Sequence, residues 1–376
     1  SRCRPMLKNA LLLLAIAVVA AGCGFRPSEP TYSVVGRIVD VDGRGVPGVT
    51  VVAQGANAIA QTGPDGVWRI DGLRGRVTIV PHLEGSRFEP MSHTVTAGTE
   101  NLRFQLVPPS YSISGRIVNA QGAGVAGVVV AVEGTNIQVT SGLDGRWRID
   151  GLDGPATVAP YRPGSEFVPA ARTVAAPTDN IVFQVLHPIM GPSVVPREQA
   201  RQWLQARIGN SDWLELVDLY YDIAPLYGIR PEVALAQAAH ETAYFRFGNL
   251  VQPWQNNFAG IGATGTPSDG FTPLNGADPE VVRFEAGVHG AIFATREIGV
   301  EAHVQHLYAY ATTAPLPAGR TLYSPRFVLV RRGTARYVEH LGARQNPAGV
   351  GWATDAEYGF KIVNNFLLPM TAFQMR

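Results

Sequence analysis

The sequence contains few cysteines and few lysines, and both shortages limit what the chain can be. Only two cysteines, Cys3 and Cys23, occur among 376 residues. Because both lie near the N-terminus, the rest of the chain must be stabilised by hydrophobic cores rather than by disulfide bonds. Lysine occurs only as Lys8 and Lys361, and the formal net charge is +1. A chain without a cationic excess is not expected to bind nucleic acid.

Long apolar runs are scarce as well, and the clearest one lies near the N-terminus. Residues 10–21 are continuously apolar and follow the basic residues Arg2, Arg4 and Lys8. A run of this length makes about 18 Å of helix, which is shorter than the hydrocarbon core of a bilayer, about 30 Å. The pattern is therefore typical of a removable targeting signal, residues 1–22, rather than of a membrane-spanning helix.

The apolar run ends in the sequence Ala20-Ala21-Gly22-Cys23. This sequence resembles the lipobox of bacterial lipoproteins, although lipoboxes usually have Leu where this chain has Ala20. The resemblance implies that Cys23 is lipidated and becomes the mature N-terminus, and two acyl chains suffice for stable membrane attachment. The alternative is an ordinary secretory signal. We therefore expect an exported lipoprotein on the extracytoplasmic face of the cell membrane, tethered through residues 23–30.

An internal repeat follows the signal. Residues 32–39 return 79 positions later as residues 111–118, and residues 65–73 return with the same offset as residues 144–152. In both copies, short β-branched runs alternate with turn signals such as Asp-Gly and Pro-Gly. The pattern predicts β-strands joined by tight turns in each copy.

Each copy, residues 31–109 and residues 110–188, is expected to form a small β-sandwich of about seven strands. Trp68 and Trp147 occupy equivalent positions, and we expect them in the cores, the alternative being a platform for stacking sugars. The pattern resembles the carboxypeptidase-regulatory-like (transthyretin-like) domains of secreted proteins, which implies a fold but little chemistry. The two copies are therefore interpreted as a stalk or spacer.

Beyond a connection rich in Pro and Gly, residues 189–196, the apolar residues recur at helical spacing. Helices are expected at residues 197–208, 211–227, 231–239 and 295–311. The fold class is therefore multidomain, with two all-β sandwiches of the transthyretin or immunoglobulin type followed by a mainly α domain in residues 197–376.

The stretch of residues 234–242 carries the clearest chemical signal. Small apolar residues dominate it, which predicts a buried helix that ends at or near Glu241. Gln237 lies four residues earlier and therefore on the same face. A carboxyl group at the end of a buried helix is easily desolvated, which raises its pKa and keeps it protonated near neutral pH. The acid of a glycosidase requires this state, whereas most helix-end glutamates are simply solvated.

Four motifs in the same region resemble the endo-β-N-acetylglucosaminidase family, whose members cleave bacterial peptidoglycan. They are, in chain order, Ala236-Gln237 with Glu241-Thr242, residues 256–262, residues 299–303 and residues 354–362. The resemblance covers roughly residues 197–370 and implies a lysozyme-like helical lobe with a small second lobe. By matching motif, Glu241 is the general acid and Tyr358 lines the cleft near the scissile bond. Ala243 departs from the family, which often has Gly at this position.

The second catalytic group has two possible sources. A mechanism with paired carboxylates needs another acid across the cleft. Four acidic residues lie in the segment expected to form the second lobe: Asp269, Asp278, Glu280 and Glu285. Alternatively, the 2-acetamido oxygen of the substrate attacks, and Tyr358 orients or stabilises the oxazolinium-like intermediate. We favour substrate assistance, because none of the four acids lies in a recognisable motif.

Residues for sugar binding are expected around residues 256–262, which should form a tight turn at the wall of the cleft. The amide side chains of Asn256 and Asn257, with that of Gln237, suit acetamido and hydroxyl groups. Three nearby aromatic residues could stack on sugar rings or could pack in the core: Tyr244, Trp254 and Phe258.

The histidines do not form a recognisable metal motif. His240 and Glu241 begin like the zinc-protease motif, but Tyr244 stands where its second histidine would be. His303 and His306 are three residues apart on an expected helix and could form half of a zinc site, yet no compact third ligand is evident. We therefore expect no metal and no cofactor, and a structural or surface role for this histidine pair.

The sequence thus predicts an enzyme that hydrolyses the GlcNAc-β-1,4-MurNAc bond of peptidoglycan glycan strands with Glu241 as the general acid. Two other interpretations stay open. A muramidase or lytic transglycosylase would use the same helix-end glutamate. A non-catalytic cell-wall-binding surface lipoprotein would have kept the cleft but lost turnover. The chemical ends of released muropeptides distinguish these three functions.

Overall fold

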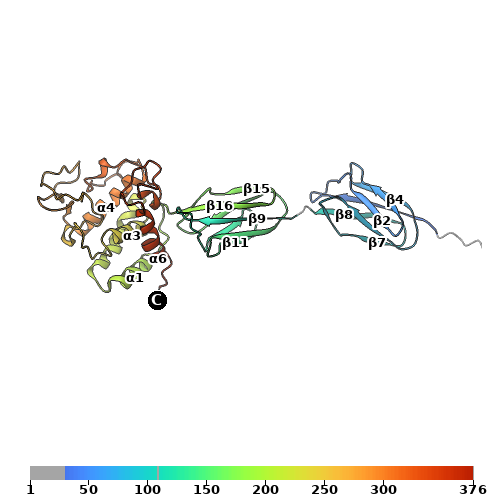
Figure 1. Cartoon of the computed structure of the whole chain (residues 1–376), viewed down its shortest axis with the longest axis horizontal. Helices are drawn as coiled ribbons and strands as arrows, with labels where there is room; N and C mark the ends of the chain where they lie inside the picture. The colour runs from blue at the N-terminus through green and yellow to red at the C-terminus, as the bar shows by residue number, and fades with distance from the viewer. Residues whose placement is uncertain (1–29, 108–109, 376) are drawn as a thin grey trace, which may run out of the picture. The chain divides into compact units, whose positions relative to one another are not determined.

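The computed structural model describes residues 30–107 and residues 110–375 (Figure 1). The expected signal and its lipidation site Cys23 lie outside the described residues. The chain divides into two compact units, residues 1–109 and residues 110–376. None of the helices in the described part of the chain combines the length and the apolar character needed to cross a membrane.

The first unit is an all-β sandwich built from two four-stranded sheets. Its strands are β1 (Tyr32–Val39), β2 (Thr50–Gln54), β3 (Ala58–Gln61), β4 (Val67–Leu73), β5 (Val77–His82), β6 (Arg87–Glu89), β7 (His93–Val95) and β8 (Thr99–Val107). One sheet has the strand order β4-β1-β8-β6, and the other has the order β3-β2-β5-β7. Neighbouring strands are antiparallel except β1 and β8, which run parallel.

The second unit begins with a sandwich of the same topology. Its strands are β9 (Tyr111–Val118), β10 (Val129–Val132), β11 (Gln138–Thr140), β12 (Arg146–Leu152), β13 (Ala156–Tyr161), β14 (Glu166–Val168), β15 (Arg172–Val174) and β16 (Thr178–Leu186). The sheet orders are β12-β9-β16-β14 and β11-β10-β13-β15. The repeat in the sequence is therefore a duplication of one fold, with eight strands in each copy rather than about seven.

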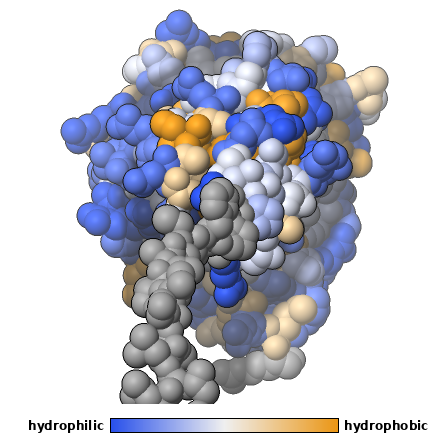
Figure 2. All heavy atoms as spheres, turned by 90° about the vertical axis from the view of Figure 1, so that its right-hand side faces the viewer, coloured by the Kyte–Doolittle hydropathy of each residue, from blue (hydrophilic) through white to orange (hydrophobic). Residues whose placement is uncertain are grey.

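An equivalent tryptophan fills the core of each sandwich. Trp68 on β4 and Trp147 on β12 are 2% and 4% exposed, which confirms their expected core position. A β-carbon on Gly36 would come within 2.4 Å of the Trp68 ring, and one on Gly115 within 2.5 Å of the Trp147 ring. Glycine is therefore required on the adjoining strand. Side chains that alternate with the core residues face outward, and hydrophilic residues cover most of the face seen in Figure 2, with small apolar patches between them.

The rest of the second unit is mainly helical, as expected. The α-helices are α1 (Arg197–Ile208), α2 (Glu215–Ile223), α3 (Pro231–Glu241), α4 (Arg296–Ala311), α5 (Tyr358–Ile362) and α6 (Leu368–Thr371). Single turns of 3-10 helix are η1 (Asp212–Leu214), η2 (Ala224–Tyr227), η3 (Pro253–Gln255), η4 (Phe327–Leu329) and η5 (Val338–Leu341), and η6 (Val363–Leu367) is a π-helical turn. The helix expected at residues 211–227 is divided into η1, α2 and η2, and Pro225, which has no N–H to donate, lies at the last junction.

Helix α3 lies inside this helical domain (Figure 1). Residues 231–239 are all buried, and the helix packs against α2, α4 and η6. Pro231 begins it, which is favourable because the first N–H groups of a helix have no partner within it. The buried helix expected from the sequence is confirmed, and it ends at Glu241.

A small second lobe separates α3 from α4 along the chain. It contains the antiparallel strands β17 (Val282–Arg283) and β18 (Ile292–Phe293) and is otherwise formed mostly by loops and turns. Its own apolar cluster consists of buried residues from both sides of the lobe: Ala259, Ile261, Ala277, Val282, Ala291, Phe293 and Ala302. This lobe supplies one wall of the cleft beside Glu241.

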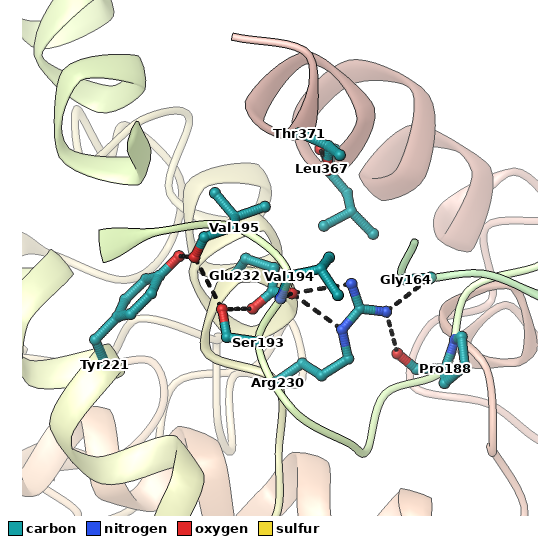
Figure 3. Close-up of polar contacts among 10 residues, drawn as sticks. All are labelled: Gly164, Pro188, Ser193, Val194, Val195, Tyr221, Arg230, Glu232, Leu367 and Thr371. Atoms are coloured by element: carbon teal, nitrogen blue, oxygen red, sulfur yellow. Dashed lines mark hydrogen bonds and ion pairs between the residues drawn. The ribbon is translucent and has the colours of Figure 1, made fainter. Parts of the chain in front are cut away.

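Within the second unit, the sandwich packs directly against the helical domain. The Nδ1 atom of His187 lies 2.7 Å from Oε1 of Glu339, and both side chains are buried. Arg230, the residue before α3, pairs with Glu232 at 2.9 Å and donates to the carbonyl oxygen of Gly164 in the sandwich at 2.8 Å (Figure 3). These contacts join the sandwich to the start of the helix that carries Glu241.

The connection between sandwich and helices, residues 189–196, is packed rather than free. Ile189 and Val195 are 0% and 1% exposed. The hydroxyl of Ser193 donates to Oε2 of Glu232 at 2.8 Å (Figure 3). The segment joins β16 to α1 without regular secondary structure, yet its side chains belong to the core and to the polar cluster around Glu232.

Candidate active site

Glu241 is the last residue of α3, and the backbone turns sharply after it. Ala243, Tyr244 and Phe245 have φ angles of 49°, 58° and 61°, which residues with a β-carbon rarely adopt. Thr242 holds this turn, because its hydroxyl donates back into the helix at 2.6 Å and accepts the N–H of Phe245 at 2.9 Å. The backbone therefore turns away from the helix axis directly after Glu241, and the carboxyl group lies at the end of the helix.

A cleft of about 740 Å³ opens beside this carboxyl group. Its lining comes from the end of α3, the loops after it, and the start of α5: Glu241, Thr242, Phe247, Gly248, Asn249, Leu250, Val251, Asn257, Ala259, Gly260, Ala263, Trp352, Ala353 and Tyr358. Among the described residues, Glu241 is the only acidic residue in this lining. Its Oε2 atom lies 3.8 Å from the place of a β-carbon on Gly260, so this oxygen faces the cleft wall.

Tyr358, at the start of α5, donates its hydroxyl hydrogen to Oε1 of Glu241. Burial raises the pKa of Glu241 to about 7, although hydrogen bonds from Tyr358 and Trp352 act in the opposite direction. A carboxyl group with this pKa is partly protonated at neutral pH and can give its proton to a bound group. Burial also raises the pKa of Tyr358 well above its usual value, so the phenol keeps its hydrogen.

Gln237 lies behind Tyr358, not in the cleft. Its amide nitrogen donates to the Tyr358 hydroxyl at 2.9 Å, and its amide oxygen lies 3.0 Å from Nε2 of His303. The Nδ1 atom of His303 is 2.6 Å from the hydroxyl of Tyr220. Gln237 is fully buried, so the expectation that it binds sugar directly is wrong. It supports the tyrosine that contacts Glu241.

The run of residues 256–262 forms the expected turn at the cleft, but only one of its predicted side chains reaches the lining. Asn256 donates to the carbonyl oxygen of Phe293 at 3.0 Å, which fixes the turn. Asn257 lines the cleft, is 1% exposed and accepts the N–H of Ile261 at 2.9 Å. Phe258 is fully buried in the helical core, so the expectation that it stacks on a sugar is wrong.

The other two predicted aromatic residues also lie outside the cleft lining. The ring of Tyr244 packs against those of Trp203 and Phe366, with centroids 5.7 Å and 4.9 Å apart. Trp254 is 54% exposed, yet it is not part of the lining. Neither ring contributes to the lining of this cleft, and the prediction that they stack against sugar stays a prediction. Their positions follow from packing in one case and from the η3 turn in the other.

The four candidates for a second catalytic carboxylate are likewise absent from the described cleft lining. Asp269 borders a separate hollow of about 480 Å³. Asp278 accepts the backbone N–H of Glu280 at 2.9 Å, and Glu285 lies 3.6 Å from an arginine on β17. The described cleft lining gives none of the four a place beside Glu241, and their pairing with it, the alternative to substrate assistance, stays a prediction.

The described residues contain no group of three or more His, Cys, Asp or Glu side chains that could hold a metal ion. Both ring nitrogens of His303 are occupied by protein hydrogen bonds. Burial lowers the pKa of His303 and of His306 to about 3, so both rings are neutral at neutral pH. The ring of His306 packs against that of Trp352 at a tilt of 60°, with centroids 4.4 Å apart. The pair has structural contacts, as expected.

Several residues of the site were not predicted from the sequence. Trp352 lines the cleft and contacts Glu241, and residues 247–251 form the opposite part of the lining. Tyr220 lies in the helix expected at residues 211–227, and the sequence alone gives no sign of its contact with His303. His303 lies in a motif matched to the family, at residues 299–303, but its contact with Gln237 depends on how two helices pack. Only proximity to matched motifs could have pointed to Trp352 and His303.

Part of the chain is similar to known proteins. Residues 217–366 match the model of a family described as mannosyl-glycoprotein endo-β-N-acetylglucosaminidase, or glucosaminidase. An uncharacterized protein of Borreliella burgdorferi is 29% identical over 143 residues, which are 38% of this chain and 56% of that protein. The chain thus spans little more than half the length of the curated relative it matches.

Solved structures of bacterial surface proteins also match the chain. A streptococcal ancillary pilin is 15% identical, with 41% of this chain and 62% of that chain covered and a TM-score of 0.20. The Bacillus anthracis TIE protein is 11% identical, with 43% and 35% covered and a TM-score of 0.28. Similarity at this level has no bearing on activity. The family match is more specific: residues 217–366, in the helical part of the second unit, are similar to the glucosaminidase family.

Proposed function

We propose that the chain is a peptidoglycan hydrolase that cleaves the GlcNAc-β-1,4-MurNAc bond, an endo-β-N-acetylglucosaminidase with Glu241 as its general acid. The observation that carries the proposal is the position of Glu241. Its carboxyl group ends a buried helix, faces a cleft and has a pKa raised by burial to about 7. This is the environment in which a carboxylic acid donates a proton to a glycosidic oxygen.

The reaction we propose is assisted by the substrate. The 2-acetamido oxygen forms a bond to the anomeric carbon while the glycosidic bond breaks, and the departing oxygen takes the proton of Glu241. Water then attacks the oxazolinium-like intermediate and gives a proton to the Glu241 carboxylate. Support comes from the described lining, where no second acidic residue accompanies Glu241. Tyr358 holds the carboxyl group through both steps.

Digestion of purified peptidoglycan tests this function. Mass spectrometry of the muropeptides is expected to show new reducing GlcNAc ends with the wild-type protein. Reducing MurNAc ends would indicate a muramidase, and anhydro-MurNAc ends a lytic transglycosylase. A digest without new ends would leave only a wall-binding function. Reduction with borohydride before analysis identifies which sugar carries the new end.

We also propose that the protein acts from the membrane surface through lipidated Cys23. The support is the sequence before this cysteine, which resembles a lipobox. Two acyl chains would hold the protein firmly, whereas a single chain gives only marginal attachment. Labelled palmitate should mark the wild-type protein, and Cys23→Ala should release it from the membrane fraction. A wild-type protein found wholly in the medium would contradict the anchor.

A further inference from the structure

Four hydrogen bonds connect Glu241 with the interior of the helical domain in single file. Tyr220 and His303 are 2.6 Å apart, His303 and Gln237 3.0 Å, and Gln237 and Tyr358 2.9 Å. Tyr358 then donates to Oε1 of Glu241. The four side chains behind Glu241 are at most 4% exposed. They form a continuous buried chain of hydrogen bonds that begins in the core and ends at the acid, and only Tyr358 among them lines the cleft.

The hydrogen-bonding groups, as the Gln237 amide is oriented, give this chain of hydrogen bonds one direction. The amide oxygen of Gln237 can only accept, so Nε2 of His303 must carry the hydrogen. Burial lowers the pKa of His303 to about 3, so the neutral ring has one N–H, and its Nδ1 must accept from Tyr220. Every donor in the chain therefore points toward Glu241.

We propose that Tyr220 and His303 are positioning residues, which keep the acidic proton of Glu241 on the oxygen that faces the cleft. Because Tyr358 donates to Oε1, that oxygen is an acceptor, and the proton must reside on Oε2, the oxygen near Gly260. The proposal deepens the proposed function and rests on Glu241 being the general acid.

The same heavy-atom positions also fit a reversed chain. If His303 carried its hydrogen on Nδ1, the Gln237 amide would turn over, and Tyr358 would donate to Gln237. Protonated Glu241 would then donate its proton to the Tyr358 oxygen, where it is of no use to a substrate. The hydroxyl of Tyr220 opposes this reversal. It would then accept from Nδ1–H, and its own buried hydrogen would lose the acceptor that Nδ1 provides.

Other titratable groups lie beside two members of this chain of hydrogen bonds, Tyr358 and His303. The ring of His240 packs 5.3 Å from that of Tyr358, and burial lowers the His240 pKa, an effect that Lys361 reinforces and Asp355 opposes. His303 neighbours His306, which is neutral at neutral pH for the same reason of burial. The direct contacts of the Glu241 carboxyl group that affect its pKa are Tyr358 and Trp352.

Tyr220→Phe tests the proposal, with Tyr221→Phe as the matched control. Tyr221 is the next residue on α2, and its hydroxyl donates to the carbonyl oxygen of Val195 at 2.8 Å, away from the chain (Figure 3). In Tyr220→Phe we expect kcat on glycan fragments to fall about tenfold with little change in KM, because the proton is misdirected while binding is not. We also expect the alkaline limb of the pH profile to move upward, because the reversed chain stabilises protonated Glu241.

Nitrogen NMR of His303 gives a readout that needs no activity. The wild-type ring should be the Nε2–H tautomer alone, and Tyr220→Phe should populate the Nδ1–H tautomer. A wild-type Nδ1–H tautomer, or equal kinetics and pH profiles in the two variants, would overturn the proposal. If the wild-type protein cleaves no glycan, the proposed function fails. The His303 tautomer and a carbon NMR titration of Glu241 still decide whether the hydrogen bonds run in the proposed direction.

Discussion

The protonation state of Glu241 should set the pH range of the enzyme. A general acid acts only while protonated, and its protonated fraction falls about tenfold per pH unit above its pKa. With a pKa raised by burial to about 7, kcat/KM should decline only above about pH 7. Rates on soluble glycan fragments between about pH 4 and pH 9 check this. A decline that begins near pH 5 would mean that Glu241 titrates as an ordinary, solvated carboxyl group.

Ala243 carries backbone strain in the turn after Glu241. Its φ of 49° is unfavourable for any residue with a β-carbon and costs about 1–2 kcal/mol. Ala243→Gly should remove this strain, but glycine also gains conformational freedom in the unfolded state. The net result should be a stabilisation of the domain by about 0.5–1 kcal/mol. Ala206→Gly, at an exposed position inside α1, is the control and should destabilise by about 1 kcal/mol. Thermal unfolding measures both, and a loss of stability in Ala243→Gly would refute the strain.

For single residues, the sequence was informative where a residue lies in a motif that matches a known family. It brought Glu241 and Tyr358 together by motif, and the structure places them in contact. It failed for Tyr244 and Phe258, because an aromatic ring near a cleft can equally well pack inside. For Tyr244 the outcome depends on the left-handed turn after α3, and that turn leaves no clear trace in the sequence. For Phe258 it depends on packing in the helical core.

At the scale of elements, each sandwich depends on its central tryptophan. Trp68→Ala should remove about 3–5 kcal/mol from a domain whose total stability is about 5 kcal/mol, and so unfold the first sandwich. Val67→Ala, at the neighbouring and 39% exposed position of β4, should leave it folded. Activity on soluble fragments should persist in both variants.

Circular dichroism and limited proteolysis report the state of this sandwich. A Trp68→Ala protein that stays folded but loses binding to intact wall would show that the ring contacts sugar and is not needed for packing.

The elements themselves were predictable to different degrees. The internal repeat predicted both sandwiches, since each copy has the same turns and the same alternation of buried and exposed residues. The run of small apolar residues at 234–242 predicted α3. The second lobe could not be derived, because its strands β17 and β18 have two residues each and its loops follow tertiary contacts. For the same reason, the sequence left open whether one of the acidic residues there pairs with Glu241.

At the scale of the whole molecule, the second sandwich is more than a spacer. Arg230 and Glu232 are 3% and 0% exposed and link the sandwich to the first turn of α3 (Figure 3). Removing one member of a buried ion pair typically costs about 3–5 kcal/mol, because the other charge is left uncompensated. Arg230→Ala should therefore lower the Tm of the second unit, by roughly 6–20 °C.

The matched control is Arg197→Ala, which removes an exposed ion pair with Asp222. Such pairs contribute at most about 1 kcal/mol, so the Tm should change little. If Arg230→Ala and Arg197→Ala have the same Tm, the sandwich and the helical domain are not coupled through Arg230.

The central claim is that Glu241 donates the proton that breaks the glycosidic bond, and Glu241→Gln tests it most directly. Glutamine keeps the shape of the side chain and its contact with Tyr358 but has no acidic proton. The measurement is kcat on purified glycan strands, with circular dichroism to confirm the fold and co-sedimentation to confirm binding. If Glu241 is the acid, kcat should fall by about 100- to 10,000-fold in a folded protein that still binds glycan. A loss smaller than about tenfold would contradict it and assign the acid to another residue.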